Sequence, residues 1–398
     1  MPRQRAGVRH RVWCADDAEQ TVRLAHRAFP DTERVARESW AMMETGDHVT
    51  FVAEEKGHIV GMMPFALRDF QIRPGVSLRA AFAHMVAVDG EWRGRGLGSA
   101  MMAYARAELR SLCDGLFVYT VVQVGHSAYN FYRRNGLVDL QYSWLLRLET
   151  PSARMPDGVA VSPWPAPAIE EEELLAVYQK AYADYAGFPV RKPQYWRGAT
   201  SSIIFEELPQ DLYLATWRGA TELLGYSIFG VRGNTAVVLE LAVLPGDEPC
   251  IEGLLQGVAA RANSCGAGRV EVFASQAHPI LGRLFTLGFR AEDPPTLRVT
   301  AGRVENLARV WLELVERSQG PAVRLLTDEG QIELEGEGAL VRLRMAEPVL
   351  HRLFLCREDI GACFSREQIA SPDLNIPIER LRHIFRPAPW IYHHLDWI

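Results

Sequence analysis

The chain has 398 residues, of which 48% are hydrophobic and 23% are charged, and its formal net charge is −6 at pH 7. This composition is typical of a soluble globular protein with about two or three domains, and the negative charge argues against a general nucleic-acid binder. No apolar stretch approaches the roughly 18–20 residues that a membrane-spanning helix requires.

The N-terminus and the cysteines indicate a cytoplasmic location. The first residues, Met1–Arg5, are basic, but no apolar segment follows them before Asp16 and Asp17, so they do not resemble a signal peptide. The six cysteines are scattered without a Cys-x-x-Cys spacing, which argues against a disulfide framework or a metal site. We therefore expect a protein of the reducing cytosol without a bound metal.

The first segment alternates helices and strands. The elements that the periodicity and the turn residues predict are helix Ala15–Phe29, strands Val49–Glu54, His58–Leu67 and His84–Val88, helix Ser99–Leu112, strand Leu116–Gln123, helix Ser127–Asn135 and strand Trp144–Leu148. Gly136 follows the last of these helices and suits a left-handed cap. This alternation predicts a mixed α/β domain, residues 1–150, whose helices cover the faces of a sheet.

The second segment repeats the order of the first. A proline-rich stretch, residues 151–167, favours a linker, and the acidic residues Glu170–Glu173 suit the first turn of a helix. The elements that follow are strands Leu212–Thr216, Leu223–Val231 and Val237–Val243, helix Ile251–Asn263, strand Arg269–Ala274 and helix Pro279–Leu287 before Gly288. An internal repeat constrains the architecture, and we expect residues 151–298 to be a degenerate second copy of the first domain.

The last segment, residues 299–398, has a different pattern. Good turn sequences separate its strands. Its expected elements are helix Val304–Arg317, strands Val323–Thr327, Gln331–Glu335 and Ala339–Met345, and short helices around His351–Leu355, Arg366–Ile369 and Ile378–Phe385. It therefore predicts a third, separate α/β domain.

A glycine-rich loop separates strand His84–Val88 from the helix that starts near Ser99, and it reads Arg93-Gly94-Arg95-Gly96-Leu97-Gly98. Glycines let the backbone turn tightly and expose consecutive N–H groups, and a helix start adds unpaired amides and the positive end of its dipole. The loop is therefore a cradle for phosphate, to which the arginines add charge. It is not a Walker loop, which needs Gly-Lys-Ser/Thr, and its glycine spacing differs from the dinucleotide fingerprint. The structural alternative is a glycine-rich turn on a basic surface.

The pattern Arg93-x-x-Gly96-x-Gly98 after a strand resembles the acetyl-CoA pyrophosphate loop of the GCN5-related N-acetyltransferases. Transfer of an acetyl group to an amine needs a neutral amine, donors for the oxyanion and an acid for the departing thiolate. We expect the backbone of Val86–Val88 to supply the donors. Tyr132 is the best candidate for the acid, since members of this superfamily commonly place a tyrosine there.

Two alternatives to an acid role for Tyr132 stay open. Tyr129 lies three residues earlier on nearly the same helix face and is the competing acid, and both rings could serve only to pack the helix against the sheet. Aligning Gly136 with Gly288 places Leu284 opposite Tyr132, which predicts that the fold does not require the hydroxyl.

The three segments together resemble the enhanced-intracellular-survival (Eis) acetyltransferase family, in which an active domain, a degenerate copy and a module similar to sterol carrier proteins follow one another. The resemblance implies that Tyr132 is the general acid and that the C-terminal carboxylate, on Ile398, reaches the active site as base or substrate anchor. It also implies aminoglycoside or lysine amines as acceptors and a hexameric assembly. The residues expected to hold acetyl-CoA are Val86, Ala87, Val88, Arg93, Gly94, Arg95, Gly96, Leu97, Gly98, Ser99, Ser127 and Ala128.

The end of the chain, Trp390–Ile398, is unusually apolar, which predicts that it is docked rather than frayed. It could be anchored in the core of the C-terminal domain or at the active site. A carboxylate with an ordinary pKa of about 3.5 is a weak base, so we expect Ile398 to orient the amine or to relay a proton through water.

Three histidines are alternative candidates for the base. We expect the adjacent pair, His393 and His394, to divide between surface and interior. For His84, immediately before the strand expected to contact the cofactor, we favour a structural role. We expect His126 to belong to the start of a helix.

The leading hypothesis is an acetyl-CoA-dependent N-acetyltransferase that acts on a primary amine of an aminoglycoside, a polyamine or a lysine-like compound. Attack should be direct, because neither motif contains a cysteine that could carry the acyl group. Two alternatives remain: a non-catalytic protein that binds acyl-CoA or a lipid, and a transferase for a longer acyl chain. We expect a homo-oligomer with no nucleic-acid, membrane or metal partner.

Overall fold

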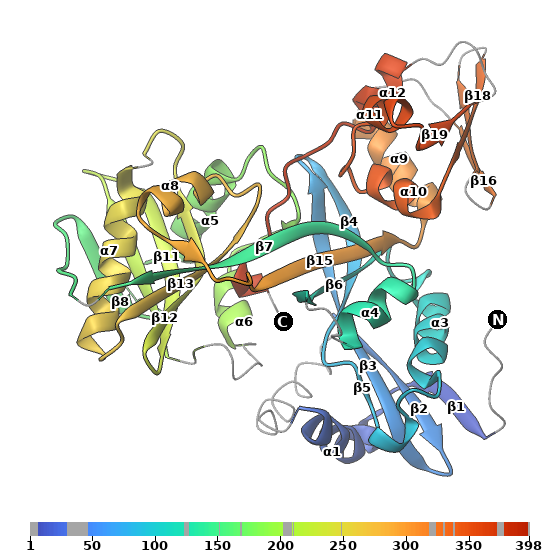
Figure 1. The fold of residues 1–398 in the computed structure, drawn as a ribbon, viewed down its shortest axis with the longest axis horizontal. Helices are drawn as coiled ribbons and strands as arrows, with labels where there is room; N and C mark the ends of the chain where they lie inside the picture. Colours follow the sequence, from blue (N-terminus) through green and yellow to red (C-terminus); the bar gives the residue numbers. More distant parts are fainter. Residues whose placement is uncertain are drawn as a thin grey trace.

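The computed structural model describes residues 7–29, 47–122, 127–150, 152–167, 169–201, 209, 211–247, 249–317, 324–328, 331–336, 339–371 and 378–396. A 15-stranded mixed sheet carries the elements up to residue 304, and a separate four-stranded sheet follows in the C-terminal part. Figure 1 shows the large sheet running through both α/β units, with β7 and β15 crossing between them. The mixed α/β class predicted from the sequence is confirmed.

The first unit of the sheet has the strand order β1-β2-β3-β4-β6. Buried Leu24 of α1 packs with Met62 on one face, whereas Met101 of α3 packs with Met63 on the other, because neighbouring strand residues point to opposite faces. The elements are β1 (Val8–Val12), η1 (Ala15–Asp17), α1 (Ala18–Ala28), β2 (His48–Glu55), β3 (His58–Arg73), β4 (Val76–Ala83), β5 (Ala87–Val88), η2 (Gly90–Trp92), α3 (Leu97–Leu109), β6 (Gly115–Val122), α4 (Ser127–Arg134) and β7 (Val138–Glu149).

The strand expected at His84–Val88 differs in the structure. The regular strand before the glycine-rich loop is β4, which ends at Ala83 and which the sequence pattern does not reveal. Met85 has a φ of +45°, in the left-handed region, and this interrupts the extended chain. Only Ala87–Val88 resumes a strand, pairing antiparallel with β3.

The second unit repeats this order, with strands β13-β12-β11-β10-β8. Three antiparallel strands lead to a parallel pair, β12 with β13, as β4 pairs in parallel with β6. The predicted linker is wrong in part, because β8 pairs with β10 as an edge strand. The elements are β8 (Val159–Pro163), α5 (Glu171–Ala181), β9 (Phe188–Pro189), α6 (Tyr195–Ser201), β10 (Leu212–Arg218), β11 (Leu223–Arg232), β12 (Thr235–Val243), α7 (Pro249–Ser264), β13 (Arg269–Ser275), α8 (Leu281–Thr286), β14 (Arg290–Ala291) and β15 (Leu297–Val304).

The last strand of each unit pairs with a strand of the other unit. β15 comes from the end of the second unit but lies between β6 and β7, and β7 in turn pairs with β13. The strand expected to close the first unit therefore borders the second, and the large sheet continues past residue 298, where we expected a domain boundary. This exchange joins the two units into one continuous sheet.

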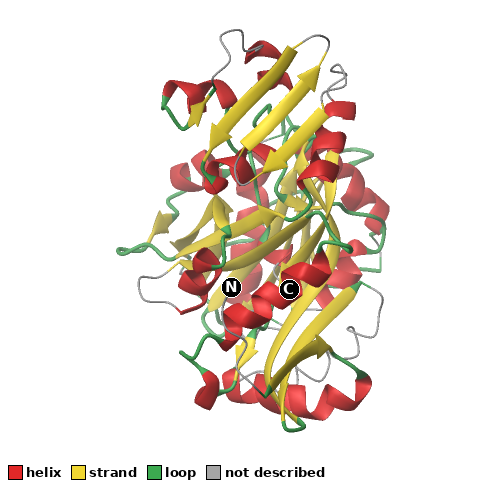
Figure 2. Ribbon diagram, turned by 90° about the vertical axis from the view of Figure 1, so that its right-hand side faces the viewer, coloured by secondary structure: helices red, strands yellow, loops and turns green. Residues whose placement is uncertain are grey.

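The C-terminal part packs four helices against a four-stranded antiparallel sheet, seen apart from the large sheet in Figure 2. The helix expected around residues 366–369 is wrong: α11 ends at Ser365, and Ile369 pairs with Met345 in strand β19. The elements are α9 (Leu307–Arg317), β16 (Arg324–Asp328), β17 (Gln331–Gly336), β18 (Ala339–Met345), α10 (Glu347–Phe354), α11 (Ile360–Ser365), β19 (Ile369–Ala370), α12 (Ile378–Ile384) and η3 (His394–Asp396). Among the described helices, none is both long and apolar enough to cross a membrane.

After α12 the chain returns to the junction of the two units, as the red trace in Figure 1 shows. The Trp390 indole N–H donates to the Ile72 carbonyl oxygen at 2.9 Å, and Ile391 N–H donates to the Ala186 carbonyl oxygen at 2.7 Å. Residues 390–396 are all buried, and together they bridge β3 and the second unit. The docked tail predicted from the sequence is confirmed as far as Asp396.

Candidate active site

The parallel strands β4 and β6 open into a V beside the glycine-rich loop. They pair at three positions, the last being Phe82 with Phe117. Beyond it β6 continues to Val122 on β15, while the chain after β4 turns aside and joins β3 as β5. The ends of the two strands therefore separate, and a ligand can insert between them.

The backbone at this V has donors that the sheet does not use. The Asp89 N–H donates to the Val60 carbonyl oxygen at 2.9 Å, so the alternation of an antiparallel ladder directs the N–H groups of Val86 and Val88 away from β3. Both residues are half-buried. The predicted oxyanion donors therefore face the open side of β5.

The glycine-rich loop has the conformation that its sequence predicts. Gly94 and Gly96 have φ values of +71° and +84°, and neither has an atom within 4 Å of the place where a Cβ would lie. Gly96 is the N-cap of α3, and the first N–H groups of a helix have no partner within the helix. Arg93 Nε donates to the Val88 carbonyl oxygen at 3.0 Å, which ties the loop to β5, and Arg95 is exposed. The loop therefore has the open backbone and the helix start that an anion-binding cradle requires.

Helix α4 packs directly on the start of α3. A Cβ on Gly98 would lie 3.1 Å from the Phe131 ring, and the Asn135 amide lies 3.5 Å from the Ser99 hydroxyl. The first residues of α4, Ser127 and Ala128, are exposed and half-buried. The structure therefore brings the predicted acetyl-CoA contacts from β5, the loop and the two helix starts to one end of the sheet.

The Tyr132 side chain points into the core between α4 and the sheet, with Leu97 and Met101 in the same cluster. It is 5% exposed, and burial raises the pKa of its hydroxyl above the ordinary value of 10.0. Among the described residues, none forms a hydrogen bond with this hydroxyl. Tyr132 is therefore protonated at neutral pH and available to a ligand.

Tyr129 has partners of its own. Its hydroxyl donates to Asp139 at 2.9 Å, and the same carboxylate accepts from Tyr142 at 2.6 Å and pairs with Arg133 at 2.9 Å. A hydroxyl already bound to a carboxylate is a poor proton donor to a thiolate. This geometry favours Tyr132 over Tyr129 as the acid.

His84 and His48 lie on the face of the sheet that α1 covers. Their rings are 5.9 Å apart, and neither nitrogen of His84 has a hydrogen-bond partner among the described residues. Burial, His48 and Arg68 lower the pKa of His84 to about 3, and burial followed by Arg68 lowers that of His48 to about 4. Both rings are neutral at physiological pH.

The tail histidines correct one prediction. His393 and His394 are each 3% exposed, so the pair does not divide between surface and interior. His393 lies among the rings of Tyr182, Phe188 and His278, and burial lowers its pKa well below the ordinary value. His126, Trp397 and Ile398 lie outside the described residues, so the structure does not test the role expected for the C-terminal carboxylate.

A buried ion triad anchors the tail in the second unit. Arg191 lies 2.5 Å from Glu240 and 2.9 Å from Asp396, and all three side chains are at most 1% exposed. The hydroxyl of Tyr195 adds a hydrogen bond to Asp396 at 2.6 Å, and the Trp196 indole donates to Glu240 at 2.8 Å. The sequence analysis missed this triad, although a glutamate in the apolar strand VVLELAV is a signal of a buried ion pair.

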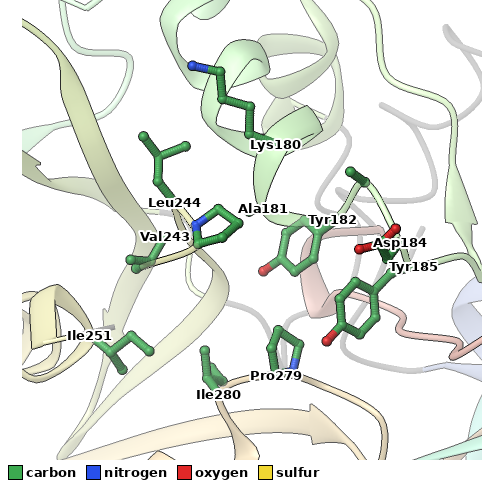
Figure 3. A pocket seen from close by; sticks show the side chains of 12 residues that line it. Lys180, Ala181, Tyr182, Asp184, Tyr185, Val243, Leu244, Ile251, Pro279 and Ile280 are labelled. Carbon is green, nitrogen blue, oxygen red and sulfur yellow. The ribbon is translucent and has the colours of Figure 1, made fainter. Parts of the chain in front are cut away.

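The second unit has the same V, but its inside is filled. β12 and β13 pair from Thr235 to Val238 and then separate, and the Tyr182 hydroxyl donates to the Leu241 carbonyl oxygen between them. Outside this filled V lies a cavity of about 260 Å³, and Figure 3 shows Tyr182, Tyr185, Pro279 and Ile280 around it. It is lined by residues 180–185 at the end of α5 and after it, by the end of β12 and by residues near the starts of α7 and α8. The last three correspond to the elements that are predicted to hold acetyl-CoA in the first unit.

Comparisons with known proteins agree with this geometry. Residues 13–137 match the model of the acetyltransferase (GNAT) family. The chain is similar in fold to a probable N-acyltransferase of unknown function from Enterococcus faecalis V583 (14% identity, 97% of this chain and 98% of that one, TM-score 0.68). It is also similar to Eis1 from Mycobacterium abscessus (14% identity, 95% and 97%, TM-score 0.54) and to a tandem GNAT protein from the clavulanic acid biosynthesis pathway (17% identity, 75% and 98%, TM-score 0.51). A search of curated protein sequences finds no match.

The family match spans the V, the glycine-rich loop and helix α4, which are the elements that the geometry brings together. The solved structures add that a tandem arrangement of this fold exists in another protein. Residues 13–137 therefore form a GNAT acetyltransferase domain, and the protein is an N-acetyltransferase.

Proposed function

We propose that the protein transfers the acetyl group of acetyl-CoA to a primary amine in the first unit, with Tyr132 as the general acid. The observation that carries this proposal is the buried Tyr132 hydroxyl, which forms no hydrogen bond with a described residue and lies in a helix packed on the start of α3. The second unit has Leu284 at the matching place. In both helices the residue after the capping glycine donates its N–H to the carbonyl oxygen of the matched residue, Leu137 to Tyr132 and Phe289 to Leu284.

Each chemical requirement has a residue in the first unit. The cradle of Gly94 and Gly96 with the start of α3 holds the pyrophosphate. The amine nitrogen bonds to the thioester carbon, and the N–H groups of Val86 and Val88 are placed to stabilise the oxyanion that forms. The C–S bond then breaks, the sulfur takes the Tyr132 proton, the amine releases its own proton to solvent, and solvent returns a proton to Tyr132.

The raised pKa of Tyr132 is consistent with an acid role. It keeps the hydroxyl protonated until negative charge develops on the sulfur. Desolvation disfavours a thiolate in the same way as a phenolate, so a thiolate leaving in this apolar place also has a raised pKa. Burial therefore raises the pKa of the proton donor and of the acceptor in the same direction.

The proposal divides the chain into a catalytic domain of residues 1–150, a degenerate copy of residues 151–298 and a C-terminal part of residues 299–398, except that β15 (Leu297–Val304) crosses the last boundary and belongs to the sheet of the first two. The hexameric state and the likeness of the last part to sterol carrier proteins stay predictions from the resemblance. The cytoplasmic location and the absence of nucleic-acid partners stay predictions from the cysteines, the N-terminus and the net charge.

The test is release of CoA by the purified full-length chain, with acetyl-CoA and a panel containing kanamycin, spermidine, L-lysine and hexylamine. We expect release that depends on an amine. Tight binding of acetyl-CoA without turnover of any amine would support a non-catalytic acyl-CoA-binding protein instead. Faster turnover with octanoyl-CoA than with acetyl-CoA would support a transferase for a longer acyl chain.

A further inference from the structure

An arginine lies on the face of the first unit opposite α3, next to the V. Arg68 is in β3, two residues from Ala66, whose cross-strand partner is Phe82, the last residue of β4 that pairs with β6. At about 3.3 Å per residue the backbones of Arg68 and Ala66 are ~7 Å apart along the strand. An arginine side chain is long enough to cover such a distance, so the register puts the V within its reach.

The alternation of the strands places Arg68 on the same face as Ala66, Phe70 and Phe82. These apolar residues belong to one core cluster with Trp390 and Tyr392 of the tail. Arg68 is only half-buried in this setting. Partial burial of a charged side chain among apolar residues costs free energy unless the charge pairs with another group.

None of the carboxylates that the structure describes forms an ion pair with Arg68. Asp69, next in sequence, lies 3.6 Å from Arg79 and 3.9 Å from Lys192. Asp396, which also lies on the tail, is committed to Arg191 and to the Tyr195 hydroxyl. Within the part of the chain that the structure describes, no ion pair or hydrogen bond of the Arg68 side chain is present.

Four neutral side chains are affected by the charge of Arg68. It lowers the pKa of His48 and His84 in addition to the larger effect of burial. Burial and then the charge of Asp396 raise the pKa of the Tyr195 and Tyr392 hydroxyls, and Arg68 counteracts both effects. Arg68 therefore adds positive charge to a polar region in which Asp396 already pairs with Arg191.

We propose that Arg68 recognises a carboxylate on the acceptor, so that the preferred substrate is an amine joined to a carboxylate by a short chain rather than a polycation. The amine would enter the V from this face while the carboxylate pairs with the guanidinium. This inference rests on the proposed acetyl transfer and specifies its acceptor. It also disfavours aminoglycosides, which carry several positive charges and no carboxylate.

The test compares kcat/KM for matched acceptors that differ by one carboxylate: 6-aminohexanoate against hexylamine, and L-lysine against cadaverine, with kanamycin as a polycation. In the wild type we expect the carboxylate-bearing member of each pair to be preferred. Arg68→Gln should lower kcat/KM for that member about 10- to 100-fold, mainly through KM, and leave the other member unchanged. Arg68→Glu should reverse the preference.

Two variants separate charge recognition from a structural role. Arg68→Lys keeps the charge and should keep most of the preference even if the fold tolerates no neutral residue at this position. Arg79→Gln removes a cation from the neighbouring strand, where it pairs with Asp47 at 2.9 Å, and should leave the preference unchanged.

The outcomes distinguish the inference from the proposed function. Equal use of both members of each pair, a preference for kanamycin, or an equal loss for both members in Arg68→Gln would overturn the inference while leaving acetyl transfer intact. Absence of CoA release with every amine would overturn both.

Discussion

The two α/β units of this chain have the same arrangement of strands and helices, but the V between the separating strands is open in the first unit and filled in the second. In each, a parallel strand pair opens after a few positions, and a helix capped by a left-handed glycine follows, Gly136 with φ +84° or Gly288 with φ +93°. In the first unit the V has outward-facing backbone donors and a glycine cradle. In the second, Tyr182 fills the V, and acidic Asp247 lies near the start of α7.

We propose that this difference separates a transfer site in the first unit from a structural support in the second. The second unit uses the space of its V to hold the tail, through the ring contact of Tyr182 with His393 and the contacts of η3 with β12. The same backbone geometry holds the chain's own tail in the second copy, and we propose that it binds acetyl-CoA in the first.

The largest expected effect is on catalysis by Tyr132→Phe. Removing the acid should lower kcat about 10²- to 10⁴-fold, while the dissociation constant for acetyl-CoA stays within about twofold because the ring remains. Steady-state CoA release and calorimetric titration measure the two quantities. Tyr129→Phe is the matched control and should retain most of the activity. An unchanged kcat in Tyr132→Phe would remove this residue from the mechanism.

The next largest effect is on stability and belongs to the second unit. Arg191→Met leaves the carboxylates of Glu240 and Asp396 buried without a counter-charge, which should lower the free energy of unfolding by about 3–5 kcal/mol. Denaturant titration measures this loss, and affinity for acetyl-CoA should not change in the protein that remains folded. A loss of less than about 1 kcal/mol would show that the triad does not hold the tail.

A smaller effect concerns the stability of the first unit at acidic pH. The folded-state pKa of His84 is about 3, against an ordinary value of 6.5, so the unfolded chain binds a proton that the folded one excludes. The stability from neutral His84 is complete above pH 6.5 and is lost as the pH falls toward 3.

At pH 5 this loss amounts to about 2 kcal/mol relative to pH 7.5. Comparing the free energies of unfolding at the two pH values for the wild type and for His84→Gln measures it. The variant should lose about 2 kcal/mol less than the wild type on acidification. The same loss in both proteins would mean that His84 binds its proton in the folded state.

The sequence predicts the repeating elements well because their signals are local. Apolar periodicity finds α3 and α4, and the glycines that need positive φ values, Gly96 and Gly136, mark where a helix begins and ends. The loop motif and Tyr132 are close enough in sequence to their supporting elements for the site to be assembled from them.

What the sequence does not reveal depends on contacts between distant segments. The exchange of β7 and β15 between the units cannot be read from either strand, because both mix apolar and polar residues and neither pattern specifies the partner strand. Arg191 and Asp396 are far apart in sequence, and their pairing follows from the path of the tail. Nothing in the sequence marks Arg68 as a site residue, because only the strand register places it beside the V.

The central claim is that the chain binds one acetyl-CoA, in the first unit, and isothermal titration calorimetry tests it most directly. Gly96→Ala and Gly246→Ala form a matched pair, because both glycines have positive φ values, +84° and +93°, in corresponding loops, where a side chain costs about 1–2 kcal/mol. We predict one acetyl-CoA per chain, an affinity about tenfold weaker in Gly96→Ala and an unchanged affinity in Gly246→Ala. Two molecules per chain, or an equal weakening in both variants, would contradict the account.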